Sequence, residues 1–276
     1  MQLSAPPVTT DDARGSDLHL ASVEIKFGNF VAVKGIDVSI RAGEFVCLLG
    51  PSGCGKSTLI SAVAGFITPS EGHVAVDGRD VHGPSPDTGM IFQSSEALFE
   101  WLTARQNVEY GPKMRGVGRK ERRAISEEYL TLVGLRNCAD RLPNQLSGGM
   151  RQRLQIARVL ANQPRAILMD EPFGALDAQT RQVMQEELDR IWRGTGCTVI
   201  FVTHDIDEAI VLADRVLVMT AGPAATIKSS YTVDLPRPRD GTSPGAIKLH
   251  HQLRSDIGEE VQKSLRDQGL ATRGTA

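Results

Sequence analysis

Hydrophobic and polar residues follow two different patterns along the chain. Some short stretches alternate apolar and polar residues, which is typical of strands with one face in water, as in an antiparallel sheet. Others are apolar throughout, which is typical of parallel strands covered on both faces. The alternating stretches are 22–27 (SVEIKF), 36–40 (IDVSI) and 73–78 (HVAVDG), and the continuous ones are 45–49 (FVCLL), 166–169 (AILM) and 198–202 (TVIFV).

Apolar residues at helical spacing lie between the continuous stretches. They form three sets: Leu59, Ile60, Val63 and Ala64; Met150, Leu154, Ala157 and Ala161; and Met184, Leu188, Ile191 and Trp192. Strands that alternate with helices predict a parallel α/β core, to which the alternating stretches add an antiparallel sheet. From about residue 94 charged, helix-favouring sequence replaces the buried-strand pattern, so we expect an inserted α-helical subdomain over about 94–160.

The two ends of the chain differ from this central part. We expect residues 1–20 to be a flexible N-terminus and the core domain to span 21–222. The tail, 223–276, is polar and carries LPRPRD at 235–240. An amphipathic helix is predicted within it, which either packs on the core or has a regulatory role. The apolar residues of that helix are Leu249, Leu253, Ile257, Val261 and Leu265.

Composition narrows the class of protein. The chain has 276 residues, of which 41% are hydrophobic, enough for a sizeable core. The formal net charge of -2 gives no reason to expect a nucleic-acid partner, and the basic residues between 113 and 123 fit a solvated helical face. The four cysteines form no C-x-x-C pair, which favours a reducing compartment. We find neither a secretion signal nor a membrane-spanning stretch in the sequence.

The segment GPSGCGKST follows a continuous apolar stretch and precedes a predicted helix. This context makes the pattern G-x-x-x-x-G-K-[ST] a phosphate-binding loop, although a glycine turn with a surface lysine is the alternative. The loop backbone is expected to wrap nucleotide phosphates, with Lys56 on the β and γ phosphates and Ser57 on Mg²⁺. Its residues are Gly50, Pro51, Ser52, Gly53, Cys54, Gly55, Lys56, Ser57 and Thr58.

Asp170 and Glu171 follow the apolar stretch 166–169. We expect Asp170 to hold Mg²⁺ and Glu171 to activate an attacking water, a role that needs reach and no metal contact. Alone, such a pair also fits a helix cap or a solvated edge. Its combination with a phosphate loop favours the catalytic interpretation.

Two further polar residues close predicted strands. His204 follows 198–202, and because the carboxyl ends of parallel strands meet at one edge, it is expected near the γ-phosphate. Gln93 ends the apolar run MIFQ and is expected to sense either Mg²⁺ or the water. The candidate catalytic residues are therefore Lys56, Gln93, Glu171 and His204, and the candidate metal ligands are Ser57, Gln93 and Asp170.

The stretch LSGGMRQRLQIA, residues 146–157, opens another predicted helix. Ser147 can cap that helix, Gly148 and Gly149 leave the approach open, and the first turn has free N–H groups. Together these features describe an anion site. The stretch has no phosphate loop of its own, so it predicts half of a site.

Six motifs, in this order and at this spacing, resemble the nucleotide-binding subunits of ABC transporters over residues 20–222. They are GPSGCGKST (50–58), the glutamine of IFQ (Gln93), LSGGM (146–150), LMDEP (168–172), GALD (174–177) and VTH (202–204). FGALDAQTR, LSGGMRQR and the PRPRD tail further resemble the branch that imports nitrate, sulfonate and taurine.

The resemblance implies a P-loop NTPase (RecA-like) fold and a head-to-tail homodimer. In this family the LSGGM segment of one subunit closes over the γ-phosphate held by the other, so Ser147, Gly148 and Gly149 would complete the partner's site. It also implies that Asp177 lies at the dimer seam. Phe27 matches the position that stacks on adenine, and the alternative is a strand phenylalanine facing the core.

Some positions depart from the family pattern. Met150 stands where many members have glutamine and Gly174 where serine is common, which could alter the rate of hydrolysis but not the reaction. In ALFEWLT, at 97–103, Glu100 replaces a frequent proline. The large apolar residues Leu98–Leu102 predict a docking groove for a membrane permease, with burial in the helical subdomain as the alternative.

These observations predict an ATPase that uses ATP and Mg²⁺ and is peripheral to the cytoplasmic face of the inner membrane. We expect it to power import of a small solute, such as nitrate, a sulfonate or taurine, through separate permease subunits, with a solute-binding protein as an indirect partner. A non-transport ABC-type ATPase and a nucleotide-dependent regulator with negligible turnover are the alternatives.

Overall fold

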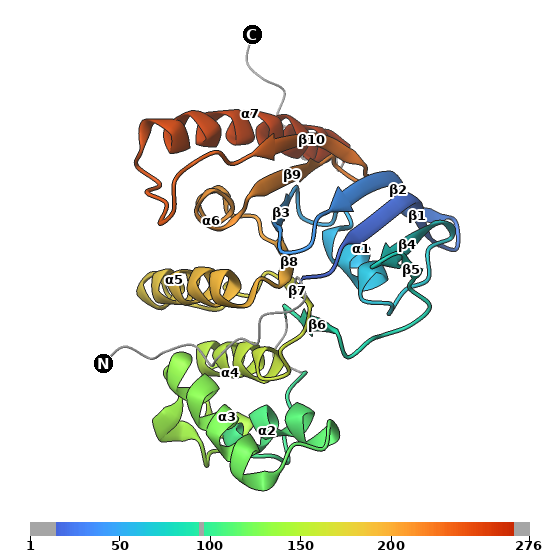
Figure 1. Cartoon of the computed structure of the whole chain (residues 1–276). Helices are drawn as coiled ribbons and strands as arrows, with labels where there is room; N and C mark the ends of the chain where they lie inside the picture. Colours follow the sequence, from blue (N-terminus) through green and yellow to red (C-terminus); the bar gives the residue numbers. More distant parts are fainter. Residues whose placement is uncertain (1–14, 94–96, 268–276) are drawn as a thin grey trace.

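Two β-sheets and a helical segment make up the chain (Figure 1). The computed structural model describes residues 15–93 and 97–267. The other positions of the expected N-terminus, helical subdomain and tail, namely 1–14, 94–96 and 268–276, lie outside the described residues. Within the described residues the predicted α/β core, antiparallel sheet and helical insertion are all present.

The larger sheet has six strands in the order β10-β9-β3-β8-β7-β6. Its strands are parallel except for β10, which pairs antiparallel at one edge. As their apolar sequences predict, β3, β7 and β8 are buried along their whole length. The bounds are β3 Phe45–Leu49, β6 Thr88–Ile91, β7 Ala166–Asp170, β8 Thr198–Val202, β9 Arg215–Met219 and β10 Ile227–Thr232.

The smaller sheet is antiparallel, in the order β2-β1-β4-β5. Asp77 and Gly78 join its last two strands with φ of 50° and 71°, which fits the hairpin turn expected from that dipeptide. Its strands are β1 Leu18–Phe27, β2 Phe30–Ile40, β4 Glu71–Val76 and β5 Arg79–Asp80. Helix α1 (Lys56–Val63) packs Leu59 and Ile60 against aliphatic side chains of both sheets.

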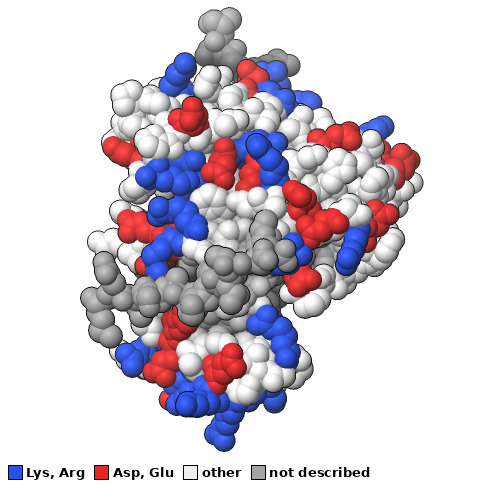
Figure 2. All heavy atoms as spheres, in the orientation of Figure 1, with Lys and Arg blue, Asp and Glu red and all other residues white. Residues whose placement is uncertain are grey.

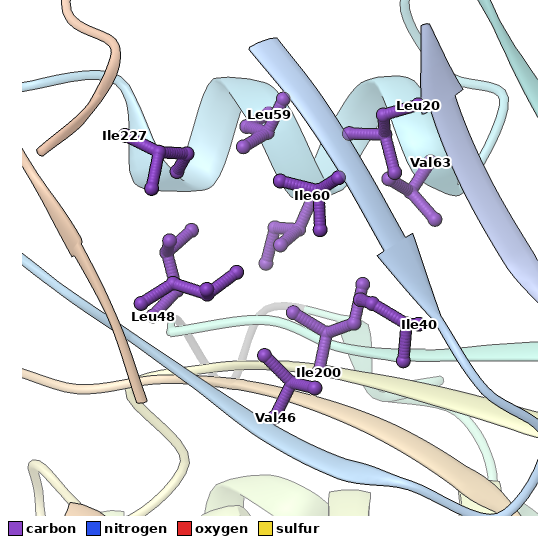
Figure 3. Close-up of a pocket in the computed structure, with 11 residues that line it drawn as sticks. Leu20, Ile40, Val46, Leu48, Leu59, Ile60, Val63, Ile200 and Ile227 are labelled. Carbon is purple, nitrogen blue, oxygen red and sulfur yellow. The ribbon is translucent and has the colours of Figure 1, made fainter. Parts of the chain in front are cut away.

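A small cavity of about 20 Å³ lies between α1 and the two sheets (Figure 3). All 11 residues that line it are Leu, Ile or Val, and Leu48, Ile60 and Ile200 point into it. The void has room for about one water molecule but offers it no hydrogen-bond partner. It is a gap in the packing and not a ligand site.

The inserted helical segment lies below the larger sheet in Figure 1. It contains α2 (Ala104–Met114), α3 (Arg119–Leu132) and α4 (Gly148–Leu160), with 3₁₀ turns at Arg136–Cys138 and Pro143–Gln145. Thr103 and Gln106 cap α2 reciprocally, each side chain accepting from the other's backbone N–H. Buried Asn107 donates to the carbonyls of Phe99 and Leu102, which ties the preceding loop to this helix.

Charged side chains of both signs are intermixed on the face shown in Figure 2. Lys and Arg gather at its lower tip, where Figure 1 shows the helical segment. On α3, which belongs to this segment, Arg119, Lys120 and Arg123 are exposed, with Glu121 between Lys120 and Arg123. The basic run is therefore a solvated helical face, as expected.

Both ends of the fold lie further out than the sequence predicts. Ser16 falls in the expected flexible N-terminus, yet it is buried and exchanges two hydrogen bonds with the Thr198 hydroxyl, at 3.0 and 2.6 Å. At the other end, β10 extends the core sheet past residue 222, the expected end of the domain. Both segments carry few apolar residues, so their place in the fold shows only in the hydrogen bonds that they form.

The tail helix α7 (Pro244–Asp267) packs back on the core, which agrees with one of its two interpretations. Leu249 and Leu253 join the core cluster beside α6 (Ile206–Leu212). A carboxylate oxygen of Glu260 accepts the backbone N–H of Ala221 at 2.8 Å. Val261, counted on the apolar side from its spacing, is exposed.

Arg237 of the PRPRD stretch anchors the tail upstream of α7. Its guanidinium lies 4.3 Å from the ring centroid of Trp192, on α5 (Ala178–Thr195), and pairs with Asp189 of the same helix. It also donates to Leu212 O at 2.7 Å and to Asp214 at 2.9 Å. One side chain therefore joins the C-terminal ends of α5 and α6 to the tail.

Candidate functional site

Four strands of the larger sheet end at the same edge, and each is followed by a residue predicted for the site. β3 leads into the phosphate loop (residues 50–58), β6 into Gln93, β7 ends with Asp170, and β8 is followed by His204 two residues later. Parallel register aligns these ends, since Val202 is the partner of both Leu48 and Asp170. This edge of an open α/β sheet is where ligands bind.

Two glycines give the phosphate loop backbone conformations that other residues rarely adopt. Gly53 and Gly55 have φ of 76° and 98°. A Cβ on Gly55 would also lie 2.7 Å from a methyl of Val33 on β2, so the backbone can pass only without a side chain. Helix α1 starts at the next residue, which aims its N-terminal N–H groups into the loop.

The side chain of Lys56 folds back onto the first residues of the phosphate loop. Its Nζ donates to the carbonyl oxygens of Gly50 and Pro51, both at 2.8 Å, and the residue is 6% exposed. Neighbouring Cys54 is also buried, which raises the pKa of its thiol, so the thiol stays neutral and passive near neutral pH. The arrangement holds a cation inside a ring of backbone groups, where a phosphate can take over its contacts.

Asp170 has the environment of a metal ligand. The residue is buried, and its Oδ1 has no hydrogen-bond partner among the described residues. Burial raises the pKa of its carboxyl, while hydrogen bonding to Ser57 counteracts the rise. An orphaned carboxylate oxygen next to a hydroxyl is a donor pair that suits Mg²⁺, so these residues fit the ion.

Glu171 is held in an uncommon backbone conformation at the end of β7. Its φ of 45° lies in the left-handed region, where residues other than glycine are rare, and such strain tends to occur at functional sites. The turn directs its Oε2 to the Gln93 amide, at 3.2 Å, and to His204 Nδ1, at 3.3 Å. Three residues predicted separately therefore meet at one carboxylate oxygen.

The LSGGM segment lies at the start of α4, as predicted. Ser147 is its N-cap, with Oγ accepting from Met150 N at 3.3 Å, and both Ser147 and Gly148 are exposed. Gly149 packs against the turn 174–177, because a Cβ added to it would lie 3.3 Å from Leu176. Asp177 ends that turn and caps α5 by accepting from Thr180 N at 3.0 Å. This capping lowers the pKa of its carboxyl.

Phe27 faces solvent and not the core. It is 51% exposed at the end of β1, which excludes the alternative that it is a core residue. Phe30, its register partner on β2, is 53% exposed and was not predicted from the sequence. The hairpin spacing of three residues could have revealed it. β2 continues from this aromatic pair to Val33, beside the phosphate loop.

The stretch 97–103 has both buried and exposed apolar side chains, so burial in the helical subdomain and a docking surface each describe part of it. Leu98 is buried in the core cluster, as the alternative predicts. Trp101 is 75% exposed and stacks on Phe99, with ring centroids 5.4 Å apart. Phe99 in turn packs on Tyr110, and the Arg158 guanidinium lies 4.5 Å from its ring centroid. A supported aromatic side chain thus faces solvent, which fits a docking surface.

Comparison with known proteins identifies the family of the chain. Residues 33–174 match the family described as ABC transporter. An uncharacterised ABC transporter ATP-binding protein of Methanocaldococcus jannaschii is 46% identical over 87% of this chain and 89% of its own length. The nitrate import ATP-binding protein of Synechococcus elongatus is 46% identical over 87% of this chain but only 36% of its own length.

Solved structures share the fold. A dimeric ATP-binding cassette in a post-hydrolysis state, bound to ADP and phosphate, has a TM-score of 0.69 and 33% identity over 78% of this chain and 98% of that chain. The structure of cbiO1 from Clostridium perfringens, described as part of the ABC transporter complex cbiONQ, has a TM-score of 0.70 and 25% identity over 88% of this chain and 96% of that chain.

Proposed function

Because the chain belongs to the ABC transporter family, as an ATP-binding cassette that hydrolyses ATP and forms dimers, we propose that it powers uptake of a small solute through separate membrane permease subunits. The main support for the proposal is that Gln93, Glu171 and His204 meet at the edge of the sheet where β3 leads into the phosphate loop. A site with this arrangement can hold a triphosphate and activate a water beside it.

Each side chain has a distinct task in the proposed reaction. The phosphate loop and the N-terminus of α1 bind the phosphates, and Lys56 leaves its carbonyl partners to contact the β and γ oxygens. Ser57 and Asp170 would hold Mg²⁺, which supplies charge neutralisation at the phosphates. Glu171 takes the proton of the attacking water, and Gln93 and His204 orient its carboxylate and the γ-phosphate.

The active unit is proposed to be a head-to-tail homodimer. Ser147 and Gly148 are exposed at the N-terminus of α4, where helix N–H groups can bind an anion, which supports their use by a second copy. In that arrangement they contact the γ-phosphate held by the partner, and Asp177 lies at the seam. Hydrolysis then removes the group that holds the dimer closed. Phe27 is proposed to stack on the adenine.

A membrane permease is proposed to dock on the helical segment near Leu98–Leu102, where Trp101 is the exposed anchor. No helix within the described residues is long and apolar enough to cross a bilayer. We propose that the chain works as a peripheral subunit at the cytoplasmic face of the inner membrane, because its relatives are named as ATP-binding proteins of transporters. A solute-binding protein would be an indirect partner through the permease.

The solute class is proposed from the relatives. Proteins named for nitrate import and for bicarbonate transport are 46–47% identical to this chain, although it spans only about a third of their length. We propose a small oxyanion or a sulfonate, such as nitrate or a taurine-like compound. The cassette itself does not contact the solute, so the permease and its binding protein define it.

The test is purification of the tagged chain from its native membrane, followed by ATPase assays with and without the co-purifying proteins. We expect two membrane permease subunits to be retained and to change the rate of phosphate release, as well as ATP-driven uptake of the solute into vesicles. Retention of DNA- or ribosome-associated proteins instead would favour a non-transport ATPase. Negligible phosphate release under both conditions would favour a regulator.

A further inference from the structure

Two loops of the site are joined by two separate contacts, which we call the front contact and the rear contact. The front contact is that between Glu171 and His204. The rear contact runs through Arg181, in the first turn of α5, which lies between the turn 174–177 and the start of α6. The front contact carries the proposed chemistry, and the rear contact has no role assigned to it.

The Arg181 guanidinium faces three oxygens, one in the turn 174–177 and two at the start of α6. Its Nη2 donates to Leu176 O, in the turn 174–177, at 3.2 Å. Its Nη1 lies 3.7 Å from Asp205 Oδ2 and its Nε 3.7 Å from Glu208 Oε1. A planar guanidinium spreads five N–H groups over three nitrogens and can face all three oxygens at once, whereas a lysine is a compact point charge.

The carboxylates that face Arg181 also set the backbone around His204. Glu208 is buried, and its Oε2 accepts from Thr203 Oγ1 at 2.6 Å. That hydroxyl in turn accepts from Asp205 N at 3.0 Å, so the residues on both sides of His204 are fixed by one network. Asp205 caps α6 through Glu208 N and Asp207 N. Burial raises the pKa of Glu208, whereas Arg181 lowers it.

The contact is incomplete in the single chain. Arg181 Nε is buried and has no hydrogen-bond partner in the part of the chain that the structure describes, since 3.7 Å to Glu208 is too long for a hydrogen bond. A buried donor left unsatisfied costs free energy, so a movement of about 1 Å that closes both gaps would be favourable. The turn 174–177 is the side of this contact that can be moved from outside, because Gly174, Ala175 and Asp177 are exposed.

We propose that Arg181 is a positioning residue that transmits closure of the dimer seam, through the turn 174–177, to the placement of His204 against Glu171. The inference depends on the proposed dimeric function, in which that turn meets a second copy of the chain. When the turn is pressed inward, Arg181 approaches Asp205 and Glu208, and the Thr203–Asp205 segment moves with it. Hydrolysis is thereby confined to the closed state.

The test compares Arg181→Met, Glu208→Gln and the double variant with the wild-type full-length chain. We expect Arg181→Met to lower kcat for MgATP by about tenfold or more and to change KM by less than about twofold, since Arg181 does not touch the nucleotide. The losses should not add in the double variant, because both changes interrupt one network. Arg190→Met is the control, since Arg190 is exposed on the same helix and pairs with Glu187, three residues before it.

A second readout separates positioning from a purely structural role. In a Glu171→Gln background, Arg181→Met should still form the ATP-dependent dimer, because closure remains possible and only its transmission is lost. Loss of that dimer, or a kcat equal to wild type, would overturn the inference. A wild-type chain that releases no phosphate at all would instead overturn the proposed function, so the two failures are distinguishable.

Discussion

Glu171 Oε2 and His204 Nδ1 lie 3.3 Å apart, although 33 positions separate the two residues in the chain. The contact exists because β7 and β8 are adjacent parallel strands, so the residues that follow them emerge side by side. It places the Glu171 carboxylate between His204 and Gln93. Catalysis is therefore expected to be most sensitive at this carboxylate.

Glu171→Gln should reduce ATP turnover by about 10²–10⁴-fold, since the amide cannot take a proton from water. ATP binding should persist, and the variant should accumulate as an ATP-dependent dimer on size-exclusion chromatography. Glu187→Gln, in the exposed ion pair on α5, is the matched control and should hydrolyse normally. Wild-type turnover in Glu171→Gln would remove the base from the proposed mechanism.

Ser147→Arg should abolish ATP-dependent dimerisation, because it places a long charged side chain on the exposed face that would meet the partner's phosphates. The change also removes a helix cap, worth about 1 kcal/mol, so stability must be followed by thermal melting. Ser147→Thr keeps a capping hydroxyl and little added bulk, and it should still dimerise. Normal dimerisation of Ser147→Arg, measured by light scattering with ATP, would contradict the head-to-tail arrangement.

Asp170→Asn should stabilise the nucleotide-free chain at neutral pH by about 2–4 °C in Tm while removing its stabilisation by Mg²⁺ and ATP. The pKa of Asp170 in the fold lies above its ordinary value of 3.8. The folded state thus binds the proton more tightly than the unfolded state, and the free energy of unfolding falls as the pH rises through this interval.

Asparagine cannot lose a proton, so the gain from Asp170→Asn should be present at pH 7 and vanish below about pH 4. Melting curves over this range, with and without MgATP, measure both effects. An equal Tm gain at every pH, or retained stabilisation by MgATP, would contradict the assignment of Asp170 as a buried metal ligand.

Trp101→Ala should weaken binding of the permease about 30-fold, the loss expected for an aromatic anchor of about 2 kcal/mol. Phosphate release by the isolated chain should stay unchanged, because Trp101 is 75% exposed and packs mainly on Phe99. Val183→Ala removes an exposed apolar side chain from α5 as the control. Co-purification of the permease at wild-type yield with Trp101→Ala would exclude this docking surface.

Arg237→Met should lower the free energy of unfolding by about 2 kcal/mol, since it removes one of the two arginines that pair with the partly buried Asp189 carboxylate, together with the stacking on Trp192. Arg254→Met, at an exposed position of α7, should change stability by less than about 0.5 kcal/mol. Urea unfolding measures both. Similar losses in the two variants would mean that the tail is not anchored through Arg237.

The sequence alone determined the parts whose physics is local. A phosphate loop requires its glycines and lysine in one stretch, and buried strands require runs of apolar residues, so both were visible before any fold was known. The cap at Ser147 and the strand ends at Asp170 and His204 follow from the same local rules. The order of the strands in space is not local, yet the sheet-edge rule predicted correctly that these ends meet.

Tertiary structure decided what depends on groups far apart in the chain. Packing decides that Phe27 and Trp101 face solvent while Leu98 is buried. The periodicity of the sequence cannot predict these exposures. Ser16 joins the fold through a hydrogen bond with the distant Thr198 hydroxyl, and β10 through backbone pairing with β9, both without an apolar pattern. The rear contact through Arg181 exists only because α5, β8 and α6 converge, and a charged residue on a helix carries no sign of such a partner in its own neighbourhood.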